Sequence, residues 1–255
     1  SAIENIRASS YVYPFARATE DFGYLQEAVR SEVLSEERIR ESTRRVLEMK
    51  SRLGMHVNVF GTPVSRKELD EYATLAQETA NKSITLCRTD GNLPVKLKSG
   101  DRILTVTVRY TEARGHLSHE LTVVDDELRN RGFHVDHMIN PSHRELIEQA
   151  KKYKRIFFNL VVTPHSLPGT IRLVGKLVLP FWRAFWVDLQ KAIFTSFGSP
   201  YHLYDMPHLT NMVLAYSATA DSQRAAVKVW LGESPAKGKC PVSLPLVDTQ
   251  MEPKI

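Results

Sequence analysis

The sequence predicts an α/β fold, a six-stranded, mostly parallel sheet with helices on both faces, and three observations support this prediction. Six short runs rich in β-branched and aromatic residues recur at regular intervals, helical patterns separate them, and one run, "IFFNLVV" (156–162), is almost entirely apolar. Strands that alternate with helices indicate βαβ units, and a strand without polar alternation indicates burial on both faces.

The first 60 residues are predicted to form a helical segment and a connector. The stretch "SEERIRESTRRVLEMKSRLGM" (35–55) is an amphipathic helix that ends at Gly54, and "VNVFGTP" (57–63) follows as a connector. We therefore predict a domain boundary near residue 60, which separates residues 1–60 from residues 61–255. The apolar positions of the helix share one face: Ile39, Thr43, Val46, Leu47 and Leu53.

The second domain is predicted to begin with a helix that Ser65 and Glu68 open as a capping box and that continues through Ala80. Strands and helices then alternate. The predicted strands are 83–87, 102–108, 133–139, 155–162, 192–197 and 211–217. The predicted helices are 118–131, 142–153 and 220–231, with a less regular pattern at 171–190.

Composition excludes several classes of function. The chain has 255 residues, 42% hydrophobic and 25% charged, and its net charge of +5 is spread along the sequence, so no nucleic-acid partner is predicted. The longest apolar stretch, from Leu173 to Trp186, is interrupted by charged residues and proline, so no membrane span is predicted. Cys87 and Cys240 lie far apart without a C-x-x-C pair, and we expect buried thiols instead of a disulfide framework or a zinc site.

Motifs for cofactors and common nucleophiles are missing from the sequence. No G-x-G-x-x-G or G-x-x-x-x-G-K-[ST] run follows a predicted strand, and no G-x-S-x-G elbow is present, so no cofactor is predicted. The histidine pairs His116/His119 and His134/His137 do not by themselves predict a metal site. His134 and His137 are separated by an odd number of residues and should lie on opposite faces of one strand.

Four loops follow predicted strands, and in a parallel sheet such loops meet ligands. They are "RYTEARGH" (109–116), "TPHSLPGT" (163–170), "GSPYHLYDMP" (198–207) and "SATADS" (217–222), all rich in hydroxyl, His, Gly or Pro residues. The alternative is that Gly and Pro make turns and the polar groups cap helices, with Asp221 or Ser222 as the cap of the last one. Glu112 is a candidate acid for glycoside chemistry, or otherwise a solvated loop carboxylate.

Four segments, taken in order, resemble glycoside hydrolase family 3 where its catalytic (β/α)8 barrel ends and its second domain begins. "AVRSEVLSEERIRESTRRVLEMKSRLGM" (28–55) is similar to the barrel-closing helix, and "LAQETANKSITLCRTDGNLPV" (75–95) to the helix and strand that follow. "FGSPYHLYDMP" (197–207) with "AYSATADSQRAAVKVWLGE" (215–233) looks most like the β-N-acetylglucosaminidase branch. "SPAKGKCPVSLP" (234–245) is similar to the signature that closes the second domain.

The resemblance implies a second domain with five parallel strands and one antiparallel strand, preceded by a remnant of the barrel. In that remnant, "SYVYPF" (10–15) would be a strand, and 22–30 and 36–53 helices. The resemblance also implies that the aspartate nucleophile and the Asp-His acid/base lie upstream on the barrel. Neither motif occurs in this chain, and its first residues lack an initiator Met, so we expect a piece of a longer protein.

The expected function is therefore that of a C-terminal portion of a glycoside hydrolase, β-N-acetylhexosaminidase-like and silent by itself. The strand-end loops would border the sugar site through Arg109, His165, Ser199, Tyr201 and Ser217. The expected partners are carbohydrate, the missing barrel domain and another copy of the chain, since an orphan barrel helix exposes its apolar stripe. Two alternatives stay open: a stand-alone module that binds carbohydrate or protein, and an enzyme that uses Glu112 as its acid. The sequence does not indicate a compartment.

Overall fold

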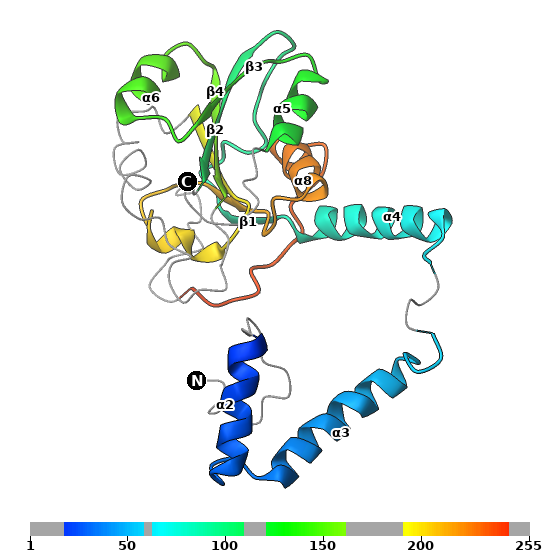
Figure 1. The fold of residues 1–255 in the computed structure, drawn as a ribbon. Helices are drawn as coiled ribbons and strands as arrows, with labels where there is room; N and C mark the ends of the chain where they lie inside the picture. Colours follow the sequence, from blue (N-terminus) through cyan, green and yellow to red (C-terminus); the bar gives the residue numbers. More distant parts are fainter. Residues whose placement is uncertain (1–17, 59–62, 110–120, 162–190, 245–255) are drawn as a thin grey trace. The chain divides into compact units, whose positions relative to one another are not determined.

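The chain divides into two compact units, residues 1–66 and 67–255. The computed structural model describes residues 18–58, 63–109, 121–161 and 191–244, shown coloured in Figure 1. The predicted strand at 10–15 and the predicted helix at 171–190 lie outside the described residues.

The described part of the first unit consists of α2 (Ala18–Arg30) and α3 (Glu36–Arg52). Ser35 caps α3, because its hydroxyl accepts the N–H of Arg38 at 3.2 Å, and Gly54 follows the helix with φ +70°. Both expected helices are therefore present. Although α3 is strongly amphipathic in sequence, none of its residues is buried.

The second unit contains one six-stranded sheet in the order β1-β6-β5-β4-β2-β3. The five strands from β6 to β3 are parallel to their neighbours, and β1 is antiparallel to β6 at one edge. The strands are β1 (Thr85–Arg88), β2 (Arg102–Arg109), β3 (His134–Ile139), β4 (Arg155–Val161), β5 (Ala192–Ser196) and β6 (Met212–Leu214). The predicted six-stranded, mostly parallel sheet is confirmed.

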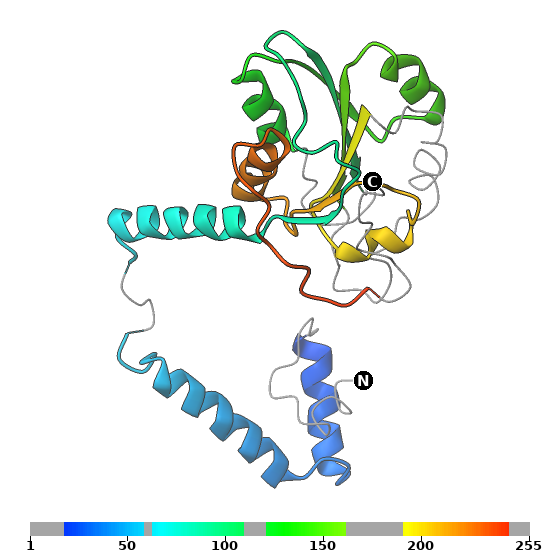
Figure 2. The same cartoon turned by 180° about the vertical axis from the view of Figure 1, so that it is seen from behind.

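Helices cover both faces of this sheet, as Figures 1 and 2 show. On one face lie α5 and α8, and on the other lie α6 and the 3-10 helix η4. Their bounds, with that of the preceding α4, are α4 (Arg66–Ser83), α5 (Thr122–Arg129), α6 (His143–Ala150), η4 (Pro200–Tyr204) and α8 (Ala220–Trp230).

Each face has its own apolar core, because neighbouring residues of a strand point to opposite sides. On the α5/α8 face, Phe157 stacks on Trp230 with ring centroids 4.4 Å apart. On the α6/η4 face, Phe158 stacks on Phe194 at 4.9 Å. All four rings are buried, which explains why the β4 run is almost entirely apolar.

Most predicted boundaries shift by one or more residues, and the following differences have a clear local description. Helix α4 continues through Ser83, so β1 begins at Thr85 and not at residue 83. Strand β6 ends at Leu214, because Tyr216 adopts φ +60° and the N–H of Ser217 turns back to the carbonyl of Ala215 at 2.7 Å. The cap of α8 is Thr219, and neither Asp221 nor Ser222 takes that place.

Candidate functional site

The carboxyl ends of the five parallel strands form the candidate site. The chain runs from β2 outward to β3 and then returns to β4 on the other side of β2, which makes β2 and β4 the point where the strand order reverses. Ligands of open α/β sheets bind outside the strand ends at such a point. The loops that follow β2 and β4 lie outside the described residues, so the described part of this edge comes from the strand ends themselves and from the segments after β3, β5 and β6.

Arg109, a predicted site residue, ends β2 and is held by Asn140, the residue after β3. The Oδ1 of Asn140 accepts the N–H of Arg109 at 2.9 Å, and its Nδ2 donates to the carbonyl of Arg109 at 2.8 Å. The backbone N–H of Asn140 also donates to the carbonyl of Thr107 at 2.9 Å. The backbone that carries the half-buried Arg109 side chain is thus fixed by three hydrogen bonds from one residue.

A hydrogen-bonded chain of four polar side chains lies beneath this edge, between β2, β3 and α5. His137 Nδ1 lies 2.6 Å from Asp125 Oδ2, and His137 Nε2 lies 2.8 Å from the Thr107 hydroxyl. Thr105 donates to the other Asp125 oxygen at 2.6 Å. Neutral His137 therefore carries its proton on Nδ1, where it donates to the carboxylate, and accepts from Thr107 on Nε2.

This order of hydroxyl, imidazole and carboxylate resembles that of a nucleophile relay. Thr107 is 0% exposed, however, so its hydroxyl cannot meet a substrate in this conformation. The network instead docks α5 onto the sheet.

The prediction that His134 and His137 lie on opposite faces of β3 is confirmed. His137 faces α5, whereas Asp136, on the same side as His134, accepts from the Tyr153 hydroxyl at 2.6 Å and from Arg102 at 3.0 Å on the other face. Among the described residues, no group of three or more His, Cys, Asp or Glu side chains could hold a metal ion.

Further polar side chains lie in register with Thr107 across the sheet. Asn159 of β4 lies opposite Thr107 on one side and Thr195 of β5 on the other. Thr195 accepts from Trp230 Nε1 at 3.0 Å, whereas the fully buried Asn159 amide has no hydrogen-bond partner among the described residues. The α5/α8 face thus carries a row of polar side chains, Thr107, Asn159 and Thr195, beside its apolar core.

The segment after β5 is held by Ser196 and His202, both fully buried. The Ser196 hydroxyl donates to the carbonyl of Ser199 at 2.9 Å, so its 2.8 Å contact with His202 Nδ1 requires that Nδ1 donate. Ser199, a predicted site residue, is buried, and its own hydroxyl accepts the N–H of Tyr201 at 3.2 Å. The "GSPY" turn is therefore internally bonded through the hydroxyl that was expected to face a sugar.

The two other predicted site residues in the described chain follow β5 and β6. The half-buried Tyr201 stacks on Tyr204, with centroids 6.2 Å apart and planes at 17°. The hydroxyl of Ser217, also half-buried, accepts the N–H of Thr219 at 3.2 Å. Of the remaining candidates, His165, Glu112, His116 and His119 lie outside the described residues.

Backbone strain gathers at the same edge. Four described non-glycine residues have positive φ, and three of them follow a strand or precede α5: Leu121 at 54°, Asn140 at 44° and Tyr216 at 60°. Such conformations persist where the surrounding structure enforces them, and functional edges are a common location. Sequence reasoning missed Asn140, although the Asn-Pro dipeptide after a strand is a turn signal that could have drawn attention to it.

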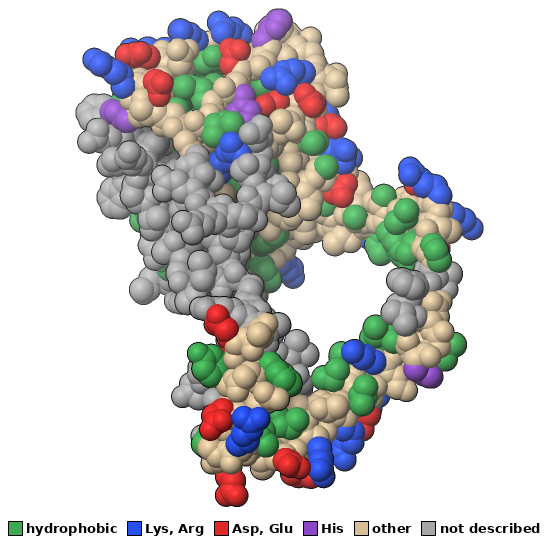
Figure 3. Space-filling view, in the orientation of Figure 1, with side chains coloured by type: hydrophobic (Ala, Val, Ile, Leu, Met, Phe, Trp, Pro, Cys, Tyr) green, Lys and Arg blue, Asp and Glu red, His purple; other side chains and the backbone are tan. Residues whose placement is uncertain are grey.

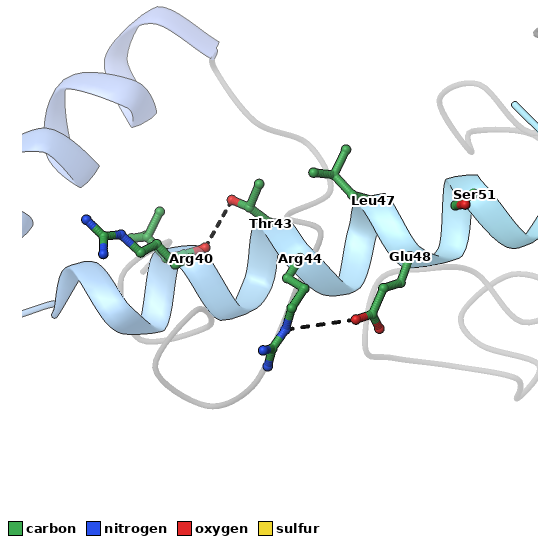
Figure 4. A pocket seen from close by; sticks show the side chains of 7 residues that line it. Arg40, Thr43, Arg44, Leu47, Glu48 and Ser51 are labelled. Carbon is green, nitrogen blue, oxygen red and sulfur yellow. Dashed lines mark hydrogen bonds and ion pairs between the residues drawn. The ribbon is translucent and has the colours of Figure 1, made fainter. Parts of the chain in front are cut away.

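The first unit offers a second surface, the exposed face of α3 in Figure 4. A shallow hollow there is lined from this one helix, around Thr43 and the 58%-exposed Leu47. Arg44 and Glu48 form an ion pair at 3.9 Å beside it. Exposed apolar side chains also lie along α4 in the second unit, as Figure 3 shows: Leu69, Tyr72 and Leu75. In the part of the chain that the structure describes, no helix is long and apolar enough to cross a membrane.

Known proteins with a similar sequence or structure were found for this chain. No family model matches the chain. A curated β-N-acetylglucosaminidase/β-glucosidase of Cellulomonas fimi is 23% identical over 245 residues, covering 88% of this chain and 42% of that protein. A solved β-glucoside phosphorylase is 28% identical, with a TM-score of 0.71, over 97% of this chain and 46% of its own. A family 3 β-N-acetylglucosaminidase from Paenibacillus sp. FPU-7 is 22% identical, with a TM-score of 0.71, over 93% of this chain and 46% of its own.

The chain is similar to enzymes of glycoside hydrolase family 3. It spans less than half the length of these three proteins and matches their C-terminal portion. The expected resemblance is confirmed, and so is the α/β sheet that it implied.

Proposed function

We propose that this chain is the C-terminal portion of a family 3 glycosidase that removes β-linked N-acetylhexosamine, and that by itself it is catalytically silent. One observation carries the proposal: α3 is a regular, capped, amphipathic helix, yet none of its residues is buried. A helix with such a stripe gains its stability in proteins by packing that stripe on a neighbour. A barrel to which α3 belongs would supply that neighbour.

The position of Asp125 supports the proposal that the chain is catalytically inactive by itself. Glycoside hydrolysis needs a nucleophile or base and an acid that both reach the scissile bond. Asp125 is 3% exposed and is engaged by His137 and Thr105, so it is not free for either role. In this reading, the groups that form and hydrolyse the glycosyl-enzyme intermediate belong to the barrel.

The carboxyl edge of the sheet borders the sugar site of the whole enzyme in this proposal. Asn140 fixes Arg109 there, and the internally bonded "GSPY" turn presents Tyr201. His165 and Ser217 complete the set of proposed rim residues. These side chains position the sugar and the barrel loops, and they take no proton and form no bond to the substrate.

The test is turnover of a chromogenic N-acetyl-β-glucosaminide by the purified chain. We expect no release of the chromophore above the blank. Turnover that disappears with a single substitution in this chain, for example Glu112→Gln, would overturn the proposal. Asp126→Asn is a matched control, because Asp126 is an exposed carboxylate on α5 whose side chain pairs with Arg129 at 3.3 Å.

A second candidate function is a stand-alone module that binds carbohydrate. The observation that favours it is the half-exposed, stacked pair Tyr201 and Tyr204, since tyrosines offer an apolar ring and a polar tip at binding surfaces. Calorimetry with N-acetylglucosamine oligomers separates the two candidates. Binding that Tyr201→Ala removes favours the module, and absence of heat favours the supporting role.

A further inference from the structure

Residues 234–244, which we call the strap, follow α8 and wrap around the free edge of β1. Even-numbered residues of the strap are half-buried or buried, whereas odd-numbered residues from Pro235 to Ser243 are exposed. Ala236 packs against the core of the α5/α8 face, and Leu244 is buried in the core of the α6/η4 face. The strap therefore crosses from one core to the other, and Figures 1 and 2 show it passing the junction of α4 and β1.

The crossing point is a close backbone contact at Gly238. The N–H of Gly238 donates to the carbonyl of Ile84 at 2.9 Å. A Cβ at this position would lie 2.0 Å from the carbonyl oxygen of Ser83 and 2.5 Å from the hydroxyl of Thr85, so only glycine lets the strap approach the edge this closely.

Two residues beyond this contact, the strap places Cys240 against the same core that contains Cys87. Cys87 lies two residues after Thr85 on the same face of β1, is 6% exposed and belongs to the α6/η4 core. Cys240 lies two residues after Gly238 on the inward side of the strap and packs against that same core. Tyr216 joins the group, because it packs against this core and its hydroxyl donates to Thr85 at 2.8 Å.

We propose that Cys87 and Cys240 form a disulfide bond when the chain meets a small disulfide such as oxidised glutathione, and that this bond locks the strap onto the edge strand. The sequence predicts no disulfide framework, because the two residues lie far apart along the chain and form no C-x-x-C pair. In the folded chain, Cys87 lies in the core of the α6/η4 face, and the strap places Cys240 against that core.

The two cysteines differ in reactivity, which sets the order of steps. Burial raises the pKa of Cys87 to about 11, and the neighbouring Cys240 adds to the effect. Cys240 is half-exposed and reacts first: its thiolate attacks one sulfur of oxidised glutathione, forms a mixed disulfide and releases one glutathione thiolate. Cys87 then loses its proton and attacks the Cys240 sulfur, and the second glutathione thiolate leaves. The chain loses two electrons and two protons, and oxidised glutathione becomes two reduced molecules.

The test is tryptic mapping of the chain after equilibration with oxidised glutathione. Trypsin cleaves after Lys82, Arg88 and the exposed Lys239, so the bond would join peptide 83–88 to the peptide that begins at Cys240. We expect this linked pair under non-reducing conditions, the two separate peptides after reduction, and an intact mass lower by two hydrogens. The oxidised chain should also unfold at a temperature higher by roughly 5–10 °C than the reduced chain.

Single variants define the controls. Cys87→Ser should stop at the glutathione adduct on Cys240, and Cys240→Ser should leave Cys87 unmodified, with no change in unfolding temperature on oxidation for either. A wild-type chain that keeps both thiols free, or that carries glutathione on Cys240 without the linked peptides, would overturn the proposal.

Discussion

The side chain of Asn140 continues the β2–β3 ladder past the end of β3 by exchanging two hydrogen bonds with the backbone of Arg109, at 2.9 and 2.8 Å. An asparagine amide offers an acceptor and a donor in the arrangement of a peptide group, so it can replace the next residue of the strand. The chain can therefore turn away at Pro141 while β2 stays paired at Arg109.

Two substitutions of Asn140 should separate the effect of its hydrogen bonds on stability from the effect of its backbone strain. Asn140→Gly removes both side-chain hydrogen bonds but tolerates φ +44°, and we expect a loss of about 1–2 kcal/mol in the free energy of unfolding. Asn140→Ala should cost about 1 kcal/mol more, because alanine does not favour that φ. Urea unfolding of the two variants measures the difference. Equal stabilities would show that no strain resides at this position.

The Thr107 hydroxyl should contribute to the stability of the fold through its hydrogen bond to His137. Thr107→Val keeps the shape of the side chain but leaves His137 Nε2 without its 2.8 Å partner, and we expect a loss of about 1 kcal/mol. Thr107→Ser retains the hydroxyl and is the control for the hydrogen bond. If the valine variant were as stable as wild type, the hydrogen bond between Thr107 and His137 would contribute nothing to stability, whereas the bonds that hold Asp125 of α5 would be untouched.

Asp136 should make stability depend on acid pH. The Tyr153 hydroxyl, followed by Arg102, lowers the pKa of Asp136 below its ordinary value. Because the folded pKa is the lower one, the stabilisation is complete above the unfolded pKa of about 3.9 and is lost as the pH falls through the folded value. The stability difference between wild type and Asp136→Asn should therefore be constant near neutral pH and shrink below roughly pH 4.

Tyr153→Phe is the matched variant for this pH dependence, since it removes the 2.6 Å hydrogen bond and leaves Arg102 in place. In this background we expect the Asp136-dependent stabilisation to be smaller and to disappear at a higher pH. An unchanged profile would mean that Arg102 alone sets the pKa of Asp136.

The exposed stripe of α3 should drive self-association of the chain. Leu47→Glu places a charge in the shallow apolar hollow, and we expect sedimentation velocity to show fewer oligomers than for wild type. Leu47 is 58% exposed, so the free energy of unfolding should change by less than about 0.5 kcal/mol.

Met49→Glu is the control for α3, because Met49 is 51% exposed but lies about 200° around the helix from Leu47. It should leave association unchanged. A wild-type chain that is monomeric at all concentrations would contradict the expectation of self-association.

Local sequence patterns predicted most of the helices and strands. Where a prediction was wrong, the cause lies in the nearby residues. Six runs became six strands, and Ser35 and Gly54 bound α3 as expected. The cap of α8 was wrong because "SATADS" offers several capping side chains, and the one chosen is Thr219, whose extended backbone lets it accept the N–H of Ser222. Candidate site residues were harder to predict from the sequence. The hydroxyl of Ser199, for example, accepts a hydrogen bond within its own turn.

The sequence by itself determined the elements, their order and the family resemblance, because apolar periodicity, caps and turn residues act over a few positions. Only the tertiary structure decided which polar groups meet: Asn140 with Arg109, His137 with Asp125 and Thr107, and the strap with β1. These partners lie on different elements, and their contact depends on the order and register in which the strands pair. That order comes from burial of two apolar cores on opposite faces of one sheet, a property of the whole domain and of no single segment.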